Sequence, residues 1–124
     1  MPVDSPLPTR DDRQVIDERL AEDHDRITER IAALERTIAE LVESGRETNI
    51  DDEHDPDGAT IGFERAQAQA LLDKARTDLE HVGEARQRLA DDPTFGTCME
   101  CGEPIGVERL LARPSTTTCI DCAR

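Results

Sequence analysis

The chain has 124 residues and a formal net charge of −14, from 29 Asp or Glu against 15 Lys or Arg. This charge disfavours non-specific binding to DNA, RNA or an anionic membrane, since all three carry phosphate. Two Phe and no Trp or Tyr leave few large side chains for an ordinary globular core. The composition therefore favours one small domain joined to a long helical element.

The N-terminal part of the chain predicts a flexible tail followed by a long helix. Residues 1–10 contain three prolines, and we expect them to form the tail. Thr9 can cap the helix that follows, and Gly45 is predicted to end it. Between them, residues spaced alternately by four and three positions predict a heptad seam. They are Leu20, His24, Ile27, Ile31, Leu34, Ile38 and Leu41.

An acidic segment, residues 45–57, separates this helix from a second one and is predicted to be a tip loop. The second helix is expected to run to about Ala90, uninterrupted by Gly62 and Gly83. Phe63 is expected to pack near its start and help close the tip. The predicted seam has the same spacing as the first. It comprises Ala68, Leu72, Ala75, Leu79, Val82, Arg86 and Leu89.

The two predicted arms are nearly equal in length, about 33 residues or roughly 50 Å each. Equal arms with a short connection favour an antiparallel helical hairpin over residues 11–92. The alternatives are arms of separate bundles and coiled coils between molecules. His24 and Arg86 are polar residues on the predicted seams, and we expect both to be solvated.

Four cysteines form two Cys-x-x-Cys pairs near the end of the chain: Cys98, Cys101, Cys119 and Cys122. Two such pairs at this separation indicate a tetrahedral, four-thiolate zinc site. The alternatives are two disulfides, a redox motif and unpaired structural thiols. Disulfides suit secreted chains, but no signal peptide is visible, so the cytoplasm is expected. A closed four-cysteine site has no open coordination position, which predicts structural zinc.

Residues 93–124 are predicted to form this C4 zinc finger after Pro93 stops the second helix. Its minimal core is expected to contain Phe95, Ile105, Leu110, Leu111 and Ile120. This core is too small to fold alone, so metal binding is expected to supply folding energy. Three arginines, Arg109, Arg113 and Arg124, are expected to offset the thiolate charge or to face a partner.

The segment "FGTCMECGEPIGVERLLARPSTTTCIDCAR", residues 95–124, resembles the C-terminal zinc finger of the DksA/TraR family of bacterial transcription regulators. The expected helical hairpin ahead of the finger also matches the layout of that family. The resemblance implies a non-catalytic regulator that binds RNA polymerase directly. Its hairpin would enter the secondary channel, and its tip would act near the active site.

The family tip carries an Asp-x-x-Asp-x-Ala pattern at the start of the second helix. Asp57 and Ala59 match its second Asp and its Ala, while His54 stands at the first acidic position and Asp55 is the nearest Asp. The resemblance therefore implies a tip site at Asp55, Asp57 and Ala59. The alternative role for Asp57 is that of a helix cap.

The resemblance also bears on the alarmone ppGpp. Val82 occupies a position that is basic in the family, and the chain ends two residues after Cys122. We therefore expect weak or absent ppGpp dependence. The alternative function is a zinc-containing coiled-coil adaptor or oligomerisation module with another protein partner. DNA or RNA binding, a membrane span and enzymatic activity are not expected, and the protein is expected to be a monomer.

Overall fold

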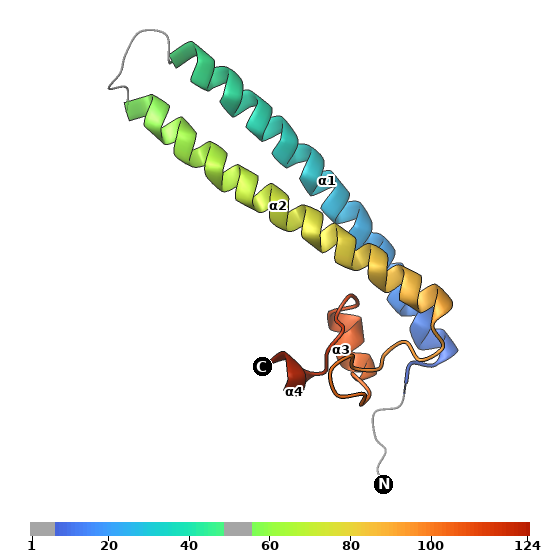
Figure 1. Ribbon diagram of the computed structural model, residues 1–124. Coiled ribbons are helices and arrows are strands. Elements are labelled where there is room, and N and C mark those ends of the chain that lie inside the picture. The colour runs from blue at the N-terminus through green and yellow to red at the C-terminus, as the bar shows by residue number, and fades with distance from the viewer. Residues whose placement is uncertain (1–6, 49–55) are drawn as a thin grey trace. The chain divides into compact units, whose positions relative to one another are not determined.

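The structure, a computed structural model, describes residues 7–48 and 56–124 and consists mainly of helices (Figure 1). The elements are α1 (Arg10–Thr48), α2 (Pro56–Asp91), α3 (Val107–Ala112) and α4 (Ile120–Ala123). Two compact units divide the chain. We call the described residues up to Asp25, together with 80–124, the base unit, and residues 26–79 the arm unit. Most of the predicted tail and of the predicted tip loop lies outside the described residues.

The first turn of α1 is held by a reciprocal cap, as the sequence predicted for Thr9. The Asp12 backbone N–H donates to Thr9 Oγ1 at 3.1 Å, and the Thr9 N–H donates to Asp12 Oδ2 at 2.9 Å. This is the capping-box arrangement, with Asp in place of the usual Glu. It satisfies two of the N–H groups that a helix start leaves without partners.

The prediction that Gly45 ends the first helix is wrong, because α1 continues to Thr48. A glycine inside a helix costs about 1 kcal/mol relative to alanine. A Cβ built at Gly45 would lie 3.8 Å from Ile61 Cγ2 on α2, an ordinary van der Waals distance, so no close approach requires glycine here. The small cost of one glycine is not enough to end the helix.

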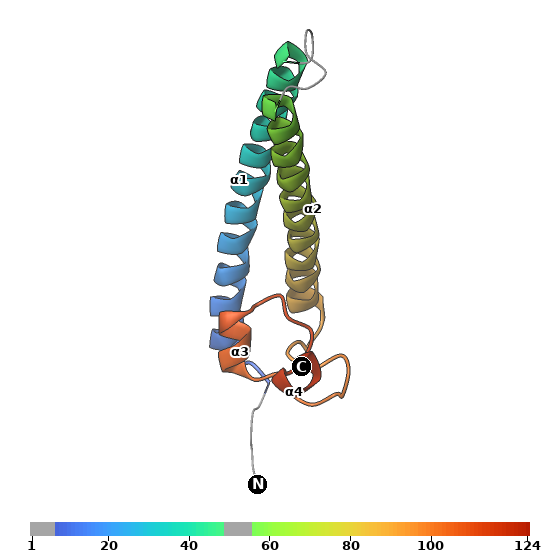
Figure 2. The ribbon, with the colours of Figure 1, turned by 90° about the vertical axis from the view of Figure 1, so that its left-hand side faces the viewer.

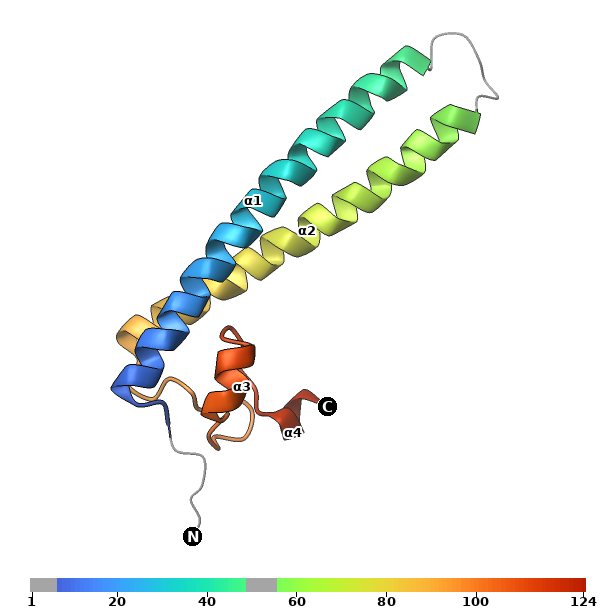
Figure 3. The same cartoon turned by 180° about the vertical axis from the view of Figure 1, so that it is seen from behind.

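In the arm unit, α1 and α2 lie side by side and run in opposite directions, which Figures 2 and 3 show from two further sides. The predicted antiparallel hairpin is confirmed. On α2, Ala68, Leu72 and Ala75 are buried against α1, whose own seam residues stay half-buried. An ion pair also crosses between the helices, with Arg76 Nη2 lying 3.1 Å from Glu35 Oε2. Both side chains are about half exposed, so their pairing adds at most about 1 kcal/mol.

One residue of the predicted α2 seam is wrong. In the base unit the buried residue is Ala85, which is 0% exposed, whereas Arg86 is exposed, as expected for a solvated side chain. The apolar alanine takes the inner position, and the charged neighbour stays in water. The prediction that Phe63 packs near the start of α2 is also wrong, because Phe63 is 71% exposed. None of the described helices is long and apolar enough to cross a membrane.

Pro8, in the short described segment before α1, packs against the beginning of the finger, residues 93–124. Gly96 has φ +101°, and a Cβ built on it would lie 2.6 Å from Pro8 Cδ and 3.4 Å from Leu110 Cδ1. Both the backbone conformation and the neighbouring proline therefore require glycine at this position. The contact connects Pro8 to Leu110, a fully buried residue of the finger.

Replacing Gly96 with alanine is expected to destabilise the protein by about 2–4 kcal/mol, combining backbone strain with a steric clash. The matched control is Gly106→Ala, since Gly106 has nearly the same φ, +104°, but nothing within 4 Å of a built Cβ. Urea unfolding followed by circular dichroism measures both variants. Equal losses of stability would show that the contact with Pro8 does not matter.

Candidate metal centre

Arg13 connects the first turns of α1 to the end of α2. Its guanidinium donates hydrogen bonds to the carbonyl oxygens of Leu89 and Asp92, the latter at 3.3 Å. The guanidinium carbon also lies 5.7 Å from the centre of the Phe95 ring, within the range of a cation–π interaction. Arg13 thus satisfies carbonyls at the α2 C-terminus and covers the first core residue of the finger.

The chain turns from α2 into the finger at Asp92. Its Oδ1 accepts hydrogen bonds from the Thr94 hydroxyl at 2.6 Å and from the Thr94 backbone N–H at 2.8 Å. These two bonds hold the pKa of the Asp92 carboxyl below its usual value, and the bond from the Thr94 hydroxyl has the larger effect. Asp92 is therefore ionised at neutral pH and fixes the geometry of the turn.

The first Cys-x-x-Cys pair lies on a tight knuckle. The Cys98 N–H donates to the Glu103 carbonyl at 2.8 Å, and the Gly102 N–H donates back to the Cys98 carbonyl at 2.9 Å. The Glu100 N–H points at Cys98 Sγ, 3.4 Å away. This backbone pairing turns Cys98 and Cys101 towards the same point.

The second pair lies at the start of the short helix α4. Cys119 is its N-terminal capping residue, and the Ala123 N–H donates to the Cys119 carbonyl at 3.0 Å. Arg109 Nε of α3 donates to the Thr118 carbonyl at 2.9 Å. The Met99 N–H donates to the Thr117 carbonyl at 2.9 Å, which joins the two knuckles.

The four cysteine sulfurs come together as one cluster. Their Sγ atoms all lie within 4.8 Å of one another, and the Cys101 and Cys119 sulfurs are 3.8 Å apart. A tetrahedral Zn²⁺ with four sulfur ligands at roughly 2.3 Å would place its ligands about 3.8 Å apart. All four cysteines are free of disulfides. The donor type, number and spacing therefore fit one zinc ion.

The cluster favours a bound cation because four neighbouring thiolates repel one another. Burial opposes ionisation of Cys98, but backbone N–H groups, that of Cys101 foremost, outweigh it and lower the pKa of Cys98 to about 6. The neighbouring thiols, that of Cys119 first, raise the pKa of Cys122. Without a counter-charge the sulfurs cannot all ionise near neutral pH. A divalent cation supplies that charge.

The core of the finger agrees in part with the prediction. Phe95, Ile105 and Leu110 are buried, and Leu111 is half-buried. Ile120 was wrongly predicted to join them, because it is 54% exposed on α4. Arg109 supports the second knuckle through Thr118, whereas Arg113 and Arg124 are exposed.

The structure gives less information on the predicted tip residues. Asp55 lies outside the described residues. Asp57 is the second residue of α2, and its role as a helix cap stays a prediction. Ala59 is exposed on the first turn of the same helix. The predicted tip site at these three positions therefore stays a prediction.

Comparison with known proteins identifies the finger. Residues 93–124 match the family model of the prokaryotic dksA/traR C4-type zinc finger. The RNA polymerase-binding transcription factor DksA of Haemophilus influenzae is 35% identical over 99 residues, which cover 80% of this chain and 63% of that protein. DksA of Escherichia coli K12 is 38% identical over 50 residues, covering 40% of this chain and 32% of that one. The chain thus spans less than two thirds of the length of these relatives.

A solved structure extends the similarity to the helices. Transcription factor DksA2 from Pseudomonas aeruginosa matches with a TM-score of 0.75 and 28% identity, over 92% of this chain and 81% of that one. The fold and the cysteine cluster define an α-helical hairpin protein with a C4 zinc finger. That finger belongs to the DksA/TraR family, so the resemblance seen in the sequence is confirmed.

Proposed function

We propose that this chain is a non-catalytic transcription regulator that binds RNA polymerase. The observation that carries the proposal is the fold shared with DksA2 over 92% of the chain, an antiparallel hairpin followed by a four-cysteine finger. The relatives named above are described as RNA polymerase-binding. In this proposal the hairpin enters the secondary channel, while the finger docks outside it and its zinc has a structural role.

We propose further that the tip residues Asp55, Asp57 and Ala59 act near the polymerase active site. Negative side chains at this end of the hairpin can approach basic groups or a bound Mg²⁺ there. The part of α2 that follows is a regular helix from Pro56 to Asp91, which gives the tip a stiff support.

The remaining features of the proposal concern partners and location. Val82 is 3% exposed within the helical seam of the base unit, so this position offers no basic group to ppGpp. This supports a weak or absent ppGpp response. The net charge of −14 argues against direct binding to DNA or RNA. A monomer in the cytoplasm, the compartment of its proposed partner, completes the proposal.

The test combines polymerase binding with transcription by purified components, with and without ppGpp. The double variant Asp55→Asn, Asp57→Asn is expected to keep its affinity for core polymerase but to lose its effect on initiation. Glu64→Asn is the control, because Glu64 is an exposed acid of α2 beyond the predicted tip. A wild-type protein that does not bind polymerase would favour the alternative function, an adaptor for another protein.

A further inference from the structure

A cleft outside the metal cluster lies in the base unit, between the last turns of α2 and the finger. Its volume is about 200 Å³, and Phe95, Met99 and Ile105 give it apolar walls. Of the four cysteines only Cys98 lines the cleft, so this cavity is distinct from the metal centre. It is also smaller than the roughly 300–1,000 Å³ typical of small-molecule sites. Its size suits a single inserted side chain.

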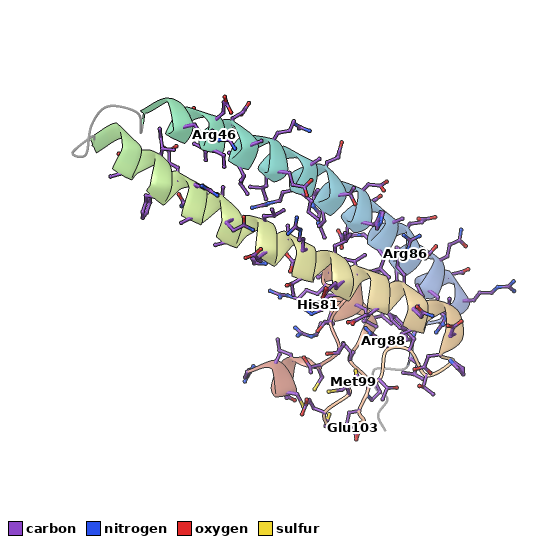
Figure 4. All side chains as sticks on the ribbon, turned by 45° about the horizontal axis from the view of Figure 1, so that its top comes forward. Arg46, His81, Arg86, Arg88, Met99 and Glu103 are labelled. Atoms are coloured by element: carbon purple, nitrogen blue, oxygen red, sulfur yellow. The ribbon has the colours of Figure 1, made fainter. Side chains whose placement is uncertain are left out.

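One wall of the cleft carries a cation, Arg88, that makes no close ion pair among the described residues and interacts with the Asp92 carboxylate only at longer range. Arg88 lines the cleft from the last turn of α2, and among the described residues no carboxylate oxygen lies within 4.0 Å of its guanidinium. Asp92, one helical turn further on, directs its Oδ1 to Thr94 instead. In Figure 4, Arg88 lies on the side of α2 that faces the finger, towards Met99, whereas Arg86 lies away from the finger.

Met99 offers an apolar surface at the cleft that nothing in the base unit covers. It is 70% exposed although its backbone is fixed by the bond from its N–H to Thr117. A flexible thioether side chain adapts to different apolar partners and is common at binding surfaces. A rigid backbone with an adaptable side chain beside a half-buried cation is a suitable arrangement for protein recognition.

We propose that this cleft is an anchor site for a segment of RNA polymerase that inserts one apolar side chain against Met99 and places a neighbouring carboxylate on Arg88. The inference rests on the proposed function and adds to it the part of the finger that makes contact. Filling a small pocket with one anchor residue and pairing a partly desolvated charge are both features of interface hot spots.

Two other occupants fit the cleft less well. A free phosphate or similar anion would meet a single arginine and would leave the apolar walls of the cleft unfilled. A second copy of this chain would bring another net charge of −14 to the interface, which opposes self-association. A partner segment with one acid and one apolar residue matches both walls.

Two matched pairs of variants test the proposal. For each variant, the affinity of the zinc-loaded 124-residue protein for core RNA polymerase is measured. Arg88→Glu is compared with Arg86→Glu, because both variants change the net charge equally and both positions lie on α2. Met99→Ser is compared with Ile120→Ser, because both residues are exposed and each follows the first cysteine of its pair. Zinc content and thermal midpoints verify that each variant is folded. If Arg88→Glu is not folded, Arg88→Gln takes its place.

Arg88→Glu and Met99→Ser are each expected to weaken polymerase binding by about tenfold or more, while the two controls change it by less than about threefold. Wild-type binding with equal affinities within each matched pair would overturn the anchor site and leave the proposed function standing. Absence of wild-type binding would overturn both. Saturable amide shifts of Thr94 and Thr97 on titration with inorganic phosphate would overturn the anchor site in favour of a bound anion. A wild-type dimer that Arg88→Glu abolishes would overturn it in favour of a second copy of this chain.

Discussion

Chelation of zinc is expected to unfold the finger, residues 93–124, while α1 and α2 keep most of their helicity. The finger contains two short helices, of six and four residues, and its other backbone pairing consists of turns and one isolated β-bridge, between Thr97 and Pro104. Helices this short are not stable alone in water. Structural zinc contributes on the order of 10 kcal/mol to small domains of this kind. Its loss therefore exceeds what the few buried residues can supply.

Two measurements separate the finger from the helices in this experiment. Amide NMR signals of residues 93–124 should collapse into the range of unfolded chains after chelation and return when zinc is added. Circular dichroism should fall only slightly, because α1 and α2 have 39 and 36 residues. Finger signals that stay unchanged in metal-free protein would contradict a structural role for the metal.

Arg13→Met is expected to destabilise the base unit by about 2–4 kcal/mol. The change removes a charged donor from the Leu89 and Asp92 carbonyls and a cation from the Phe95 ring. Hydrogen bonds to charged groups contribute about 1.5–3 kcal/mol, and a carbonyl left without a donor adds its desolvation cost. The finger should also open more often in hydrogen exchange, because Phe95 loses its cover.

The control for this variant is Arg10→Met, which removes an equal charge from the exposed first residue of the same helix. Arg13→Lys is expected to recover only part of the stability, since an ammonium cannot reach both carbonyls with the geometry of a guanidinium. Similar urea midpoints for Arg13→Met and Arg10→Met would show that the Arg13 contacts contribute nothing.

Much of the helical fold follows from the sequence because helix packing has a simple period. The four-and-three spacing identified both arms, and the cap at Thr9 was predicted, although its reciprocal bond with Asp12 was not. One exception arises where packing decides which of two adjacent residues is buried. Ala85 takes the buried position in place of Arg86. Gly45 is a separate exception, because the cost of about 1 kcal/mol for one glycine is too small to end α1 there.

The clustering of the four cysteines was predictable to the residue because the chemistry of zinc ligands restricts both the residue type and the spacing. The contacts of the side chains around this cluster could not be predicted from the sequence. Arg13 is 76 residues from Leu89 in the chain, and no local pattern indicates that they meet. The cleft at Arg88 and Met99 was missed for the same reason, since its walls come from α2 and from both knuckles. Long-range contacts of single side chains leave no periodic signal.

The half-buried seam of α1 in the arm unit has a consequence for how that region loses its structure. Among the described residues of the arm unit, α1 and α2 are the only helices, so each of these apolar residues is covered from one side, by the opposite helix. When one helix of this pair unfolds at a given turn, the apolar side chains of the other helix at that turn become exposed to water. The two therefore melt in step, turn by turn, and neither can serve as a template on which the other reforms.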